Sequence, residues 1–491
     1  MIPQSLKPPS RSEPITFPVF ALTWTATPTS PNSARSIVVC SGGGGSGKHG
    51  VKNLVRISIQ DDDPRVSRTV SIDTKEMVAF CVAIREVVEN NVSIFWICIG
   101  TGDLVQMYTL NVIPCEGIPD EAQLVSEVNV GKGYGTNSLA FSPLNDALVV
   151  GCENGNLCLV KWNGKDLKLK KTDLEYMGHT KAVCKVEFHP TQPNIVISSA
   201  KDGTCRLWNL QLLPNEACVD QMTCSIYDAA HPPKDQKLLN PKPGQNVVKG
   251  CAFGDFEGRV VYSIQSGRKP DKTGKKRGSF LSVWKLVRRV VPLVDEKTPV
   301  SAPKERSGRK EPNMQEVLKF EEQLRVPVSN YPASAFSLSG DLSTIAIGDT
   351  DGSITLLSTT TFKPVKHWAN VHDLPVTCIA ARPLPIGLAG EQKYGVTVDA
   401  VSCSADNQMV FLTKQKRSTL KTSKTSDSGS SLFRFWFFLV LIVFAYIGKV
   451  SYDVCLYEFE SGHDFKVAKE CVVHTVLWAS SNRPGVESVP F

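Results

Sequence analysis

A glycine-rich segment near the N-terminus has residue types suited to holding a phosphate group or a cation. Six of the twelve residues from Gly42 to Asn53 are glycine. Gly42, Gly47 and Lys48 fit the G-x-x-x-x-G-K pattern of a phosphate-binding loop. That pattern needs a Ser or Thr hydroxyl for magnesium where this chain has His49, and the segment opens into a strand-like run instead of a helix. These departures argue against nucleotide hydrolysis.

The same glycines suggest a different role for the loop. Glycine adopts positive φ angles readily, and a path with several such angles turns backbone carbonyls inward. We expect converging carbonyls on residues 42–53 to hold a weakly hydrated monovalent cation. A loop stiffened in this way would present Lys48, Lys52 and the Asn53 side chain on its far side. The alternatives are a merely flexible loop and simply solvated lysines.

The spacing of the cysteines and histidines indicates no catalytic or metal-binding site. Thirteen of the 15 cysteines precede residue 432, scattered singly, with no CxxC pair and no Cys/His metal spacing. They are interpreted as reduced thiols packed as small apolar side chains. No Ser-His-Asp or paired-carboxylate arrangement can be picked out, so we expect neither hydrolytic activity nor a small-molecule substrate. No basic stripe interleaved with aromatics indicates nucleic-acid binding.

The elements that must position the loop are recurring strand-like runs. The clearest unit, Gly178–Leu210, has a Gly-His pair, three apolar runs, an Asp-Gly turn and a final Trp-Asn, like a WD-type propeller blade. His179 is expected to be its structural histidine. Asn-Gly and Asp-Gly turns, which suit tight hairpins, recur in further units. Those units span residues 17–60, 78–110, 136–162, 247–286, 333–357 and 376–412.

These units predict an all-β, seven-bladed propeller over residues 14–414, with the glycine loop as an enlarged hairpin in its first blade. The alternative is a β-sandwich with a second domain. Residues 1–13 are expected to be a flexible N-terminus. Insertions are expected at about residues 264–279, which include the basic run Arg268–Arg277, and at residues 290–325, a polar segment interpreted as a mobile loop.

One apolar run near the C-terminus predicts a membrane anchor. Leu432 to Gly448 comprises 17 residues, which as a helix at about 1.5 Å per residue span about 26 Å. That length suits the endoplasmic reticulum bilayer of about 27 Å. Lys and Arg are concentrated in the linker of residues 415–431, which predicts a cytosolic N-terminal domain.

The tail of residues 449–491 would then lie in the lumen. Its two cysteines, Cys455 and Cys471, would face an oxidising compartment. We expect a disulfide between them. Asn91 begins an Asn-Val-Ser glycosylation acceptor, but it falls on the cytosolic side and should be unmodified.

The chain resembles a known family at specific residues. It has FPVF at Phe17–Phe20, the loop GGGG-x-G-x-x-G-[IV]-x-N at residues 42–53, a propeller and one C-terminal anchor. These features resemble the prolactin regulatory element-binding protein family, the exchange factors that activate the Sar-type GTPase of the COPII coat. The sequence likeness is strong for residues 17–60 and generic to propellers elsewhere.

The resemblance implies a guanine-nucleotide exchange factor at the endoplasmic reticulum membrane that starts COPII vesicle formation and ER-to-Golgi transport. It implies that the loop binds potassium and touches the GTPase, and that Asn53 is essential for exchange. The GTPase-contacting residues would be Gly42, Gly43, Gly44, Gly45, Gly47, Lys48, Gly50 and Lys52. The alternative is a membrane-anchored scaffold or cargo-specific export helper without exchange activity.

Overall fold

The computed structural model describes most of the chain up to residue 415. The described ranges are residues 11–30, 33–45, 50–60, 67–89, 92–112, 122–162, 166–224, 246–267, 278–292, 314–384 and 396–415. The chain divides into two units, Met1–Lys416 and Arg417–Phe491. All of the second unit lies outside the described residues, and so do most of the expected linker, the expected anchor and the expected lumenal tail.

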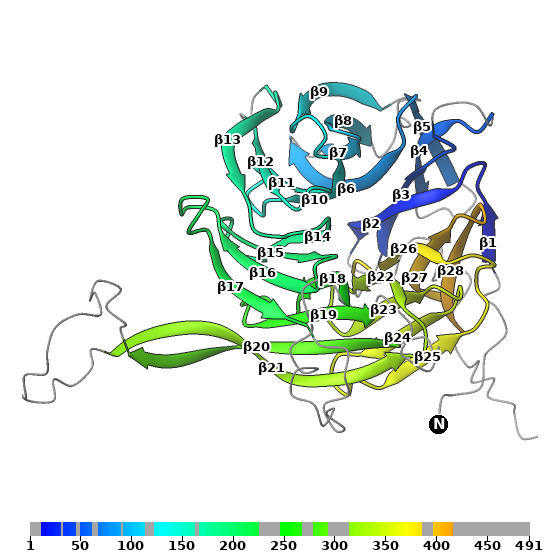
Figure 1. Ribbon diagram of the computed structural model, residues 1–491. Helices are drawn as coiled ribbons and strands as arrows, with labels where there is room; N and C mark the ends of the chain where they lie inside the picture. The colour runs from blue at the N-terminus through cyan, green and yellow to red at the C-terminus, as the bar shows by residue number, and fades with distance from the viewer. Residues whose placement is uncertain are drawn as a thin grey trace, which may run out of the picture. The chain divides into compact units, whose positions relative to one another are not determined.

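The first unit is a ring of seven four-stranded antiparallel sheets, or blades (Figure 1). Blades 1 and 2 consist of β2 (Val19–Ser30), β3 (Ser33–Gly42), β4 (Asn53–Gln60) and β5 (Ser67–Lys75), then β6 (Ala79–Glu89), β7 (Val92–Thr101), β8 (Leu104–Val112) and β9 (Gln123–Asn129). Blades 3 and 4 consist of β10 (Thr136–Phe141), β11 (Ala147–Cys152), β12 (Leu157–Lys161) and β13 (Lys170–Tyr176), then β14 (Val183–Phe188), β15 (Ile195–Ala200), β16 (Thr204–Asn209) and β17 (Cys218–Thr223).

Blades 5 to 7 complete the ring and confirm the predicted seven-bladed propeller. Blades 5 and 6 consist of β18 (Asn246–Phe253), β19 (Val260–Gly267), β20 (Ser279–Pro292) and β21 (Met314–Ser329), then β22 (Ala333–Leu338), β23 (Thr344–Asp349), β24 (Ile354–Ser358) and β25 (Pro364–Trp368). Blade 7 consists of β26 (Val376–Ala381), β27 (Val396–Ser404), β28 (Gln408–Gln415) and β1 (Arg11–Pro14).

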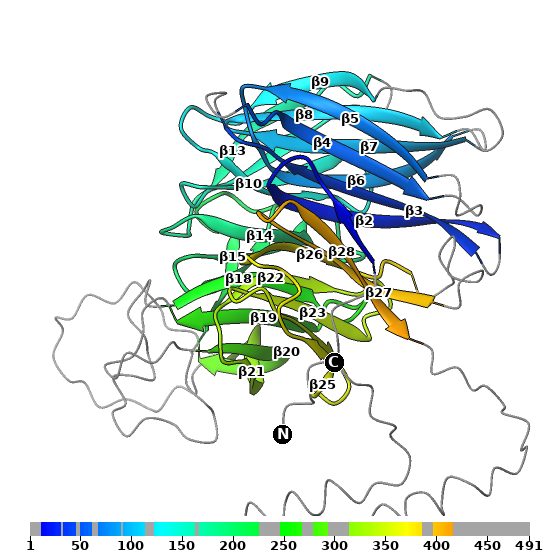
Figure 2. The same ribbon diagram turned by 90° about the vertical axis from the view of Figure 1, so that its right-hand side faces the viewer.

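Each blade runs from an inner strand beside the ring axis to an outer strand at the rim, and Figure 2 shows strands of blades 1 and 2 crossing the thickness of the ring. The middle strands are almost wholly buried; all six residues of β11 are, for example. Outer strands are largely exposed, as β9 shows. This gradient follows from packing, because each middle strand has a paired strand on both edges and neighbouring blades against its faces, whereas an outer strand has one unpaired edge.

Seven apolar clusters hold the ring together, and each lies between two neighbouring blades. The cluster between blades 1 and 2 is built from β-branched side chains such as Ile37, Ile57 and Ile97. The cluster between blades 7 and 1 joins Phe17 and Trp24 to Phe411. Because every blade contributes to two clusters, no blade can bury its apolar faces alone.

The N-terminus closes the ring. Strand β1 pairs antiparallel with β28, from Arg11 opposite Phe411 to Pro14 opposite Gln408. Residues 11–13 were expected to belong to a flexible terminus, and this expectation is wrong. The sequence RSEP is polar, but β28 offers it an unpaired edge, and backbone hydrogen bonding needs no apolar side chains.

Blade 5 also differs from the expectation. The segment 290–325 was predicted to be a mobile loop, yet β21 occupies residues 314–329 and pairs with β20 along a long hairpin that projects from the ring (Figure 1). Phe320 on β21 is buried in the cluster between blades 4 and 5. The segment is polar because it is an outer strand. Residues 293–313 lie outside the described part of the chain.

Candidate functional site

The glycine-rich loop connects β3 to β4 in blade 1, as predicted. The corresponding connection in blade 2 is a two-residue turn, since Thr101 of β7 pairs with Leu104 of β8. In blade 1 the last pair at this end joins Gly42 to Leu54, so the connection is much longer. It links two strands, and therefore no helix N-terminus is available for phosphates. Ser46, Gly47, Lys48 and His49 lie outside the described residues.

The first two glycines are required by close approach of the backbone. A Cβ on Gly42 would lie 1.8 Å from the carbonyl oxygen of Pro18, and a Cβ on Gly43 would lie 2.2 Å from Asn53 Oδ1. Gly43 also has a φ of 147° and donates its N–H to the Pro18 carbonyl at 3.0 Å. No larger residue fits at either position without moving the backbone.

Asn53 closes the base of the loop with three hydrogen bonds. Its Oδ1 accepts from the Gly45 N–H at 3.1 Å, and its Nδ2 donates to the Gly45 carbonyl at 3.0 Å and the Lys75 carbonyl at 2.8 Å. The side chain is only 2% exposed. The sequence analysis placed this amide on the outer side of the loop, whereas the structure turns it inward. Asn53 is therefore a positioning residue that ties the loop to the end of β5.

The described outer part of the loop is more open. Gly45 and Gly50 have φ angles of 79° and 71°, and a Cβ on either would meet nothing within 4 Å. At these two positions glycine is needed for its positive φ angle and not because space is tight. This agrees with the predicted run of positive φ angles. Gly44 is half-buried against Val51, which packs on the cluster between blades 7 and 1, while Lys52 is exposed.

The expected cation site falls partly on residues 46–49, which lie outside the described residues. The carbonyls of Pro18, Gly45 and Lys75 already accept hydrogen bonds from Gly43 and Asn53. Among the residues the structure describes, no group of three or more His, Cys, Asp or Glu side chains could hold a metal. Potassium binding by the loop therefore stays a prediction.

His179 is a structural histidine, as predicted. Its Nδ1 lies 2.9 Å from Asp202 Oδ2 and its Nε2 lies 2.7 Å from Ser198 Oγ, which also accepts from Trp208 Nε1 at 2.8 Å. Burial lowers the pKa of His179 and so favours the neutral imidazole, although Asp202 acts to raise it. Burial acts to raise the pKa of Asp202, but hydrogen bonds from His179 and Thr204 outweigh it and lower the pKa to about 2. This chain of contacts ties β15 and β16 of blade 4 to the β13–β14 connection and the β15–β16 turn.

A second network of this kind, in blade 7, was missed by the sequence analysis. His372 Nδ1 lies 2.9 Å from Asp406 Oδ2, and His372 Nε2 lies 2.9 Å from Ser402 Oγ. The sequence signal is weak because Val371 stands where blade 4 has glycine. The histidine and aspartate are also 34 residues apart, against 23 in blade 4. The longer spacing accommodates the β26–β27 connection.

The described cysteines behave as the sequence suggested. Twelve cysteines fall within the described ranges, and all are free. Burial raises the pKa of Cys40 and of Cys81 to about 12, so these thiols stay protonated. The proposed disulfide of Cys455 and Cys471, the glycosylation acceptor Asn91 and the basic run Arg268–Arg277 lie outside the described residues. Within the described part of the chain, no helix is long and apolar enough to cross a membrane.

Comparison with known proteins identifies one repeat directly. A family model described as "WD domain, G-beta repeat" matches residues 170–209, which run from β13 to the end of β16. The chain contains a WD repeat. Together with the seven sheets of the ring, this match makes the described part of the chain a WD-type β-propeller.

The relatives of this WD propeller are diverse and match only in part. Human Coronin-7 is 30% identical over 146 residues, which cover 29% of this chain and 14% of that protein. Histone acetyltransferase type B subunit 2 of Candida glabrata is 31% identical over 102 residues, covering 21% of this chain and 23% of that protein. Polycomb protein esc of Musca domestica is 47% identical over 36 residues, covering 7% and 8%. The matches thus span less than a quarter of each relative.

Proposed function

We propose that this WD propeller is a guanine-nucleotide exchange factor for a Sar-type small GTPase, acting at the endoplasmic reticulum membrane to start COPII vesicle formation. The main support for the proposal is the enlarged β3–β4 connection. Hydrogen bonds between the Asn53 side chain and the backbone of Gly45 and Lys75 fix its base. Its motif matches the exchange-factor family at every glycine. The three hydrogen bonds of the buried Asn53 amide hold the base of this long loop in one conformation.

Exchange by this route needs no covalent chemistry. An exchange factor must bind the nucleotide-free GTPase better than the loaded one, and only that difference in affinity drives release. The propeller supplies a rigid frame, and the tied base fixes the direction in which the loop leaves it. Lys52, exposed beside the loop, supplies a positive charge for an acidic patch on the GTPase. In this proposal Asn53 acts through the loop it positions and does not touch the GTPase.

The membrane part of the proposal rests on the apolar run Leu432–Gly448. Confining the factor and its GTPase to one membrane surface raises their effective concentration. The cytosolic placement of the propeller and the lumenal placement of residues 449–491 follow from the basic linker. Potassium belongs to the same proposal and would be held by backbone carbonyls of the loop. Replacing potassium with sodium in the buffer would then slow exchange.

The second candidate is a membrane-anchored scaffold or cargo-specific export helper that binds partners without exchanging nucleotide. The partial matches to other WD proteins are consistent with a binding role of this general kind. Nucleotide release separates the two candidates. Only the exchange factor accelerates GDP release from a Sar-type GTPase.

The test is fluorescence-detected GDP release from a Sar-type GTPase on liposomes carrying the full chain. Asn53→Ala should reduce release to near the intrinsic rate. Because Asn53 is buried, we expect it also to lower the free energy of unfolding by about 1–3 kcal/mol, more than the 0.5 kcal/mol or so of an exposed site. Asn154→Ala, in the exposed β11–β12 turn of blade 3, is the matched control and should leave release unchanged. Full release by the Asn53 variant would rule out the loop mechanism.

A further inference from the structure

The propeller encloses a central channel with a regular construction. Every inner strand carries a register shift near its start. In blades 1 to 5 the residue at the shift lines the channel, and in blades 6 and 7 the residue after the shift does. Going round the ring from blade 1 to blade 7, these lining residues are Phe20, Phe80, Asn137, Cys184, Lys249, Ala335 and Cys378. The channel volume is about 590 Å³, within the range of about 300–1,000 Å³ typical of ligand sites.

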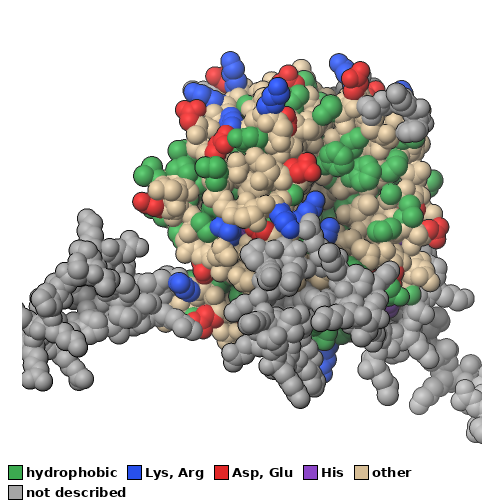
Figure 3. Space-filling model, in the orientation of Figure 1, with side chains coloured by type: hydrophobic (Ala, Val, Ile, Leu, Met, Phe, Trp, Pro, Cys, Tyr) green, Lys and Arg blue, Asp and Glu red, His purple; other side chains and the backbone are tan. Residues whose placement is uncertain are grey.

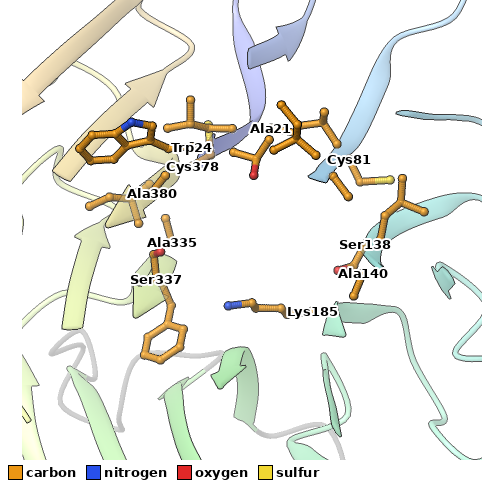
Figure 4. A pocket seen from close by; sticks show the side chains of 18 of the residues that line it. Ala21, Trp24, Cys81, Ser138, Ala140, Lys185, Ala335, Ser337, Cys378 and Ala380 are labelled. Carbon is orange, nitrogen blue, oxygen red and sulfur yellow. The ribbon is translucent and has the colours of Figure 1, made fainter. Parts of the chain in front are cut away.

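The channel wall has a positive charge. Lys185 and Lys249 lie near its start in the neighbouring blades 4 and 5, and Arg85 lies further along β6. Figure 4 shows Lys185 extending into the open centre. Among the described residues that line the channel, none is Asp or Glu. Figure 3 shows Lys or Arg side chains close to the middle of one face of the ring.

The partners of these cations leave most of that charge available. Lys185 Nζ lies 3.4 Å from Glu187 Oε2 and 5.3 Å from the centre of the Phe336 ring. The other oxygen of Glu187 accepts a hydrogen bond from the Phe253 N–H at 3.1 Å. Arg85 donates to the neutral carbonyl of Pro143 at 3.2 Å. Glu187 therefore offsets the charge of Lys185, while the described residues form no ion pair with Lys249 or Arg85.

The opposite side of the same opening is apolar. Phe20 and Phe80 occupy the shift positions of blades 1 and 2, and their ring centres lie 5.7 Å apart. Phe80 is 50% exposed. Exposed apolar surface of this kind is typical of a binding site. The opening thus has an aromatic pair on blades 1 and 2 and two lysines on blades 4 and 5.

This opening lies on the face that carries the glycine loop. Pro18, whose carbonyl holds Gly43, comes two residues before Phe20. Lys75, whose carbonyl holds Asn53, ends the strand before the one that carries Phe80. The inner strands are also edge strands of their sheets, so one edge of each presents backbone groups to the channel.

We propose that this opening binds an acidic peptide segment of a partner protein. Acidic side chains would lie against Lys185 and Lys249, and an apolar side chain beside them would pack on the Phe20–Phe80 pair. A small oxyanion would satisfy the lysines but leave the aromatic pair uncovered, whereas a peptide uses both. The proposal does not depend on nucleotide exchange, and its test contains neither GTPase nor nucleotide.

The probe is a fluorescein-labelled hexapeptide of four glutamates around a central leucine and phenylalanine, titrated with the full chain in detergent. Fluorescence anisotropy should show saturable binding that weakens with added salt. Lys185→Gln/Lys249→Gln should weaken binding about tenfold, equivalent to about 1.4 kcal/mol, and Phe80→Ser should weaken it several-fold. Lys201→Gln, in the β15–β16 turn on the same face, is the matched control and should change it less than about twofold.

Several outcomes would overturn the proposal. One is the absence of saturable binding to the unsubstituted chain. Another is equal binding of a matching peptide with lysines in place of glutamates, and a third is equal loss in the Lys201→Gln control. Inorganic phosphate added at the same concentration of negative charge as the peptide tests for a simple oxyanion. If it displaces the peptide completely, the ligand is a simple oxyanion and the peptide assignment is wrong. The double variant could lose binding simply because it fails to fold. The single variant Lys249→Gln and thermal unfolding curves distinguish that case from loss of the binding site.

Discussion

At the scale of single residues, the glycine motif predicts the importance of Asn53 but not the direction of its side chain. The sequence indicated that this asparagine matters, because it closes a glycine-rich pattern. Which way its amide points depends on the carbonyls of Gly45 and Lys75, and Lys75 is brought there by the pairing of β4 with β5. That pairing is set by the whole blade. The residue was therefore predictable, and its inward direction was not.

Asp349 gives a pH-dependent prediction at the same scale. It is fully buried, and burial raises its pKa to about 7 although Ser329 Oγ donates to it at 2.7 Å. In the unfolded chain an aspartate has a pKa of about 3.9. Between these values the native state holds a proton that the unfolded state has lost, so stability falls as pH rises from about 4 to about 7.

Asp349→Asn should remove this pH dependence, because an amide does not titrate and can still accept from Ser329. Between pH 5 and pH 8, the unsubstituted protein should lose roughly 2 kcal/mol more unfolding free energy than the variant. Urea unfolding at several pH values measures the difference. Asp373→Asn, at an exposed position, is the control. Parallel pH profiles for Asp349→Asn and the unsubstituted protein would contradict the assignment.

At the scale of elements, inner and middle strands could be predicted and two outer strands could not. Middle strands such as β11, ALVVGC, have apolar side chains on both faces. Outer strands contact the core through only a few side chains, as β21 does through Phe320, Val326 and Val328. Their composition is that of a loop, which explains the misassigned segment 290–325. The strand β1 was missed for the same reason, since three of its four residues are polar and it pairs with β28 through the backbone.

The closing strand leads to a second prediction. Deleting residues 1–14 removes β1, unpairs β28 and breaks the ion pair between Glu13 and Arg56. We expect the free energy of unfolding to fall by about 2–4 kcal/mol, at roughly 0.5–1.5 kcal/mol for each hydrogen bond lost. Deleting only residues 1–10 leaves the strand in place and is the control. Equal thermal unfolding midpoints for the two deletions would show that β1 does not stabilise the ring.

At the scale of the whole molecule, a rigid ring carries a loop, a channel opening and an expected membrane tether. The seven-bladed architecture was predictable because its turns and apolar runs recur along the chain. The channel was not predictable from the sequence, because the residues that line it come from seven separate strands. Under the two proposals, this face would act on a GTPase through the loop and bind an acidic segment through the channel opening.

The most direct measurement of the central claim is GDP release from a Sar-type GTPase by a chain whose loop has been cut to a tight turn. Replacing residues 44–51 with Asn-Gly gives blade 1 the kind of turn found in blade 3. We expect release at the intrinsic rate, against acceleration of more than about tenfold by the unsubstituted chain. The shortened chain should unfold cooperatively with a midpoint lowered about as much as that of Asn53→Ala, because the buried Asn53 amide loses Gly45 and Val51 is removed from the cluster between blades 7 and 1. Equal acceleration by both chains would contradict the account, because the propeller would then work without its glycine loop.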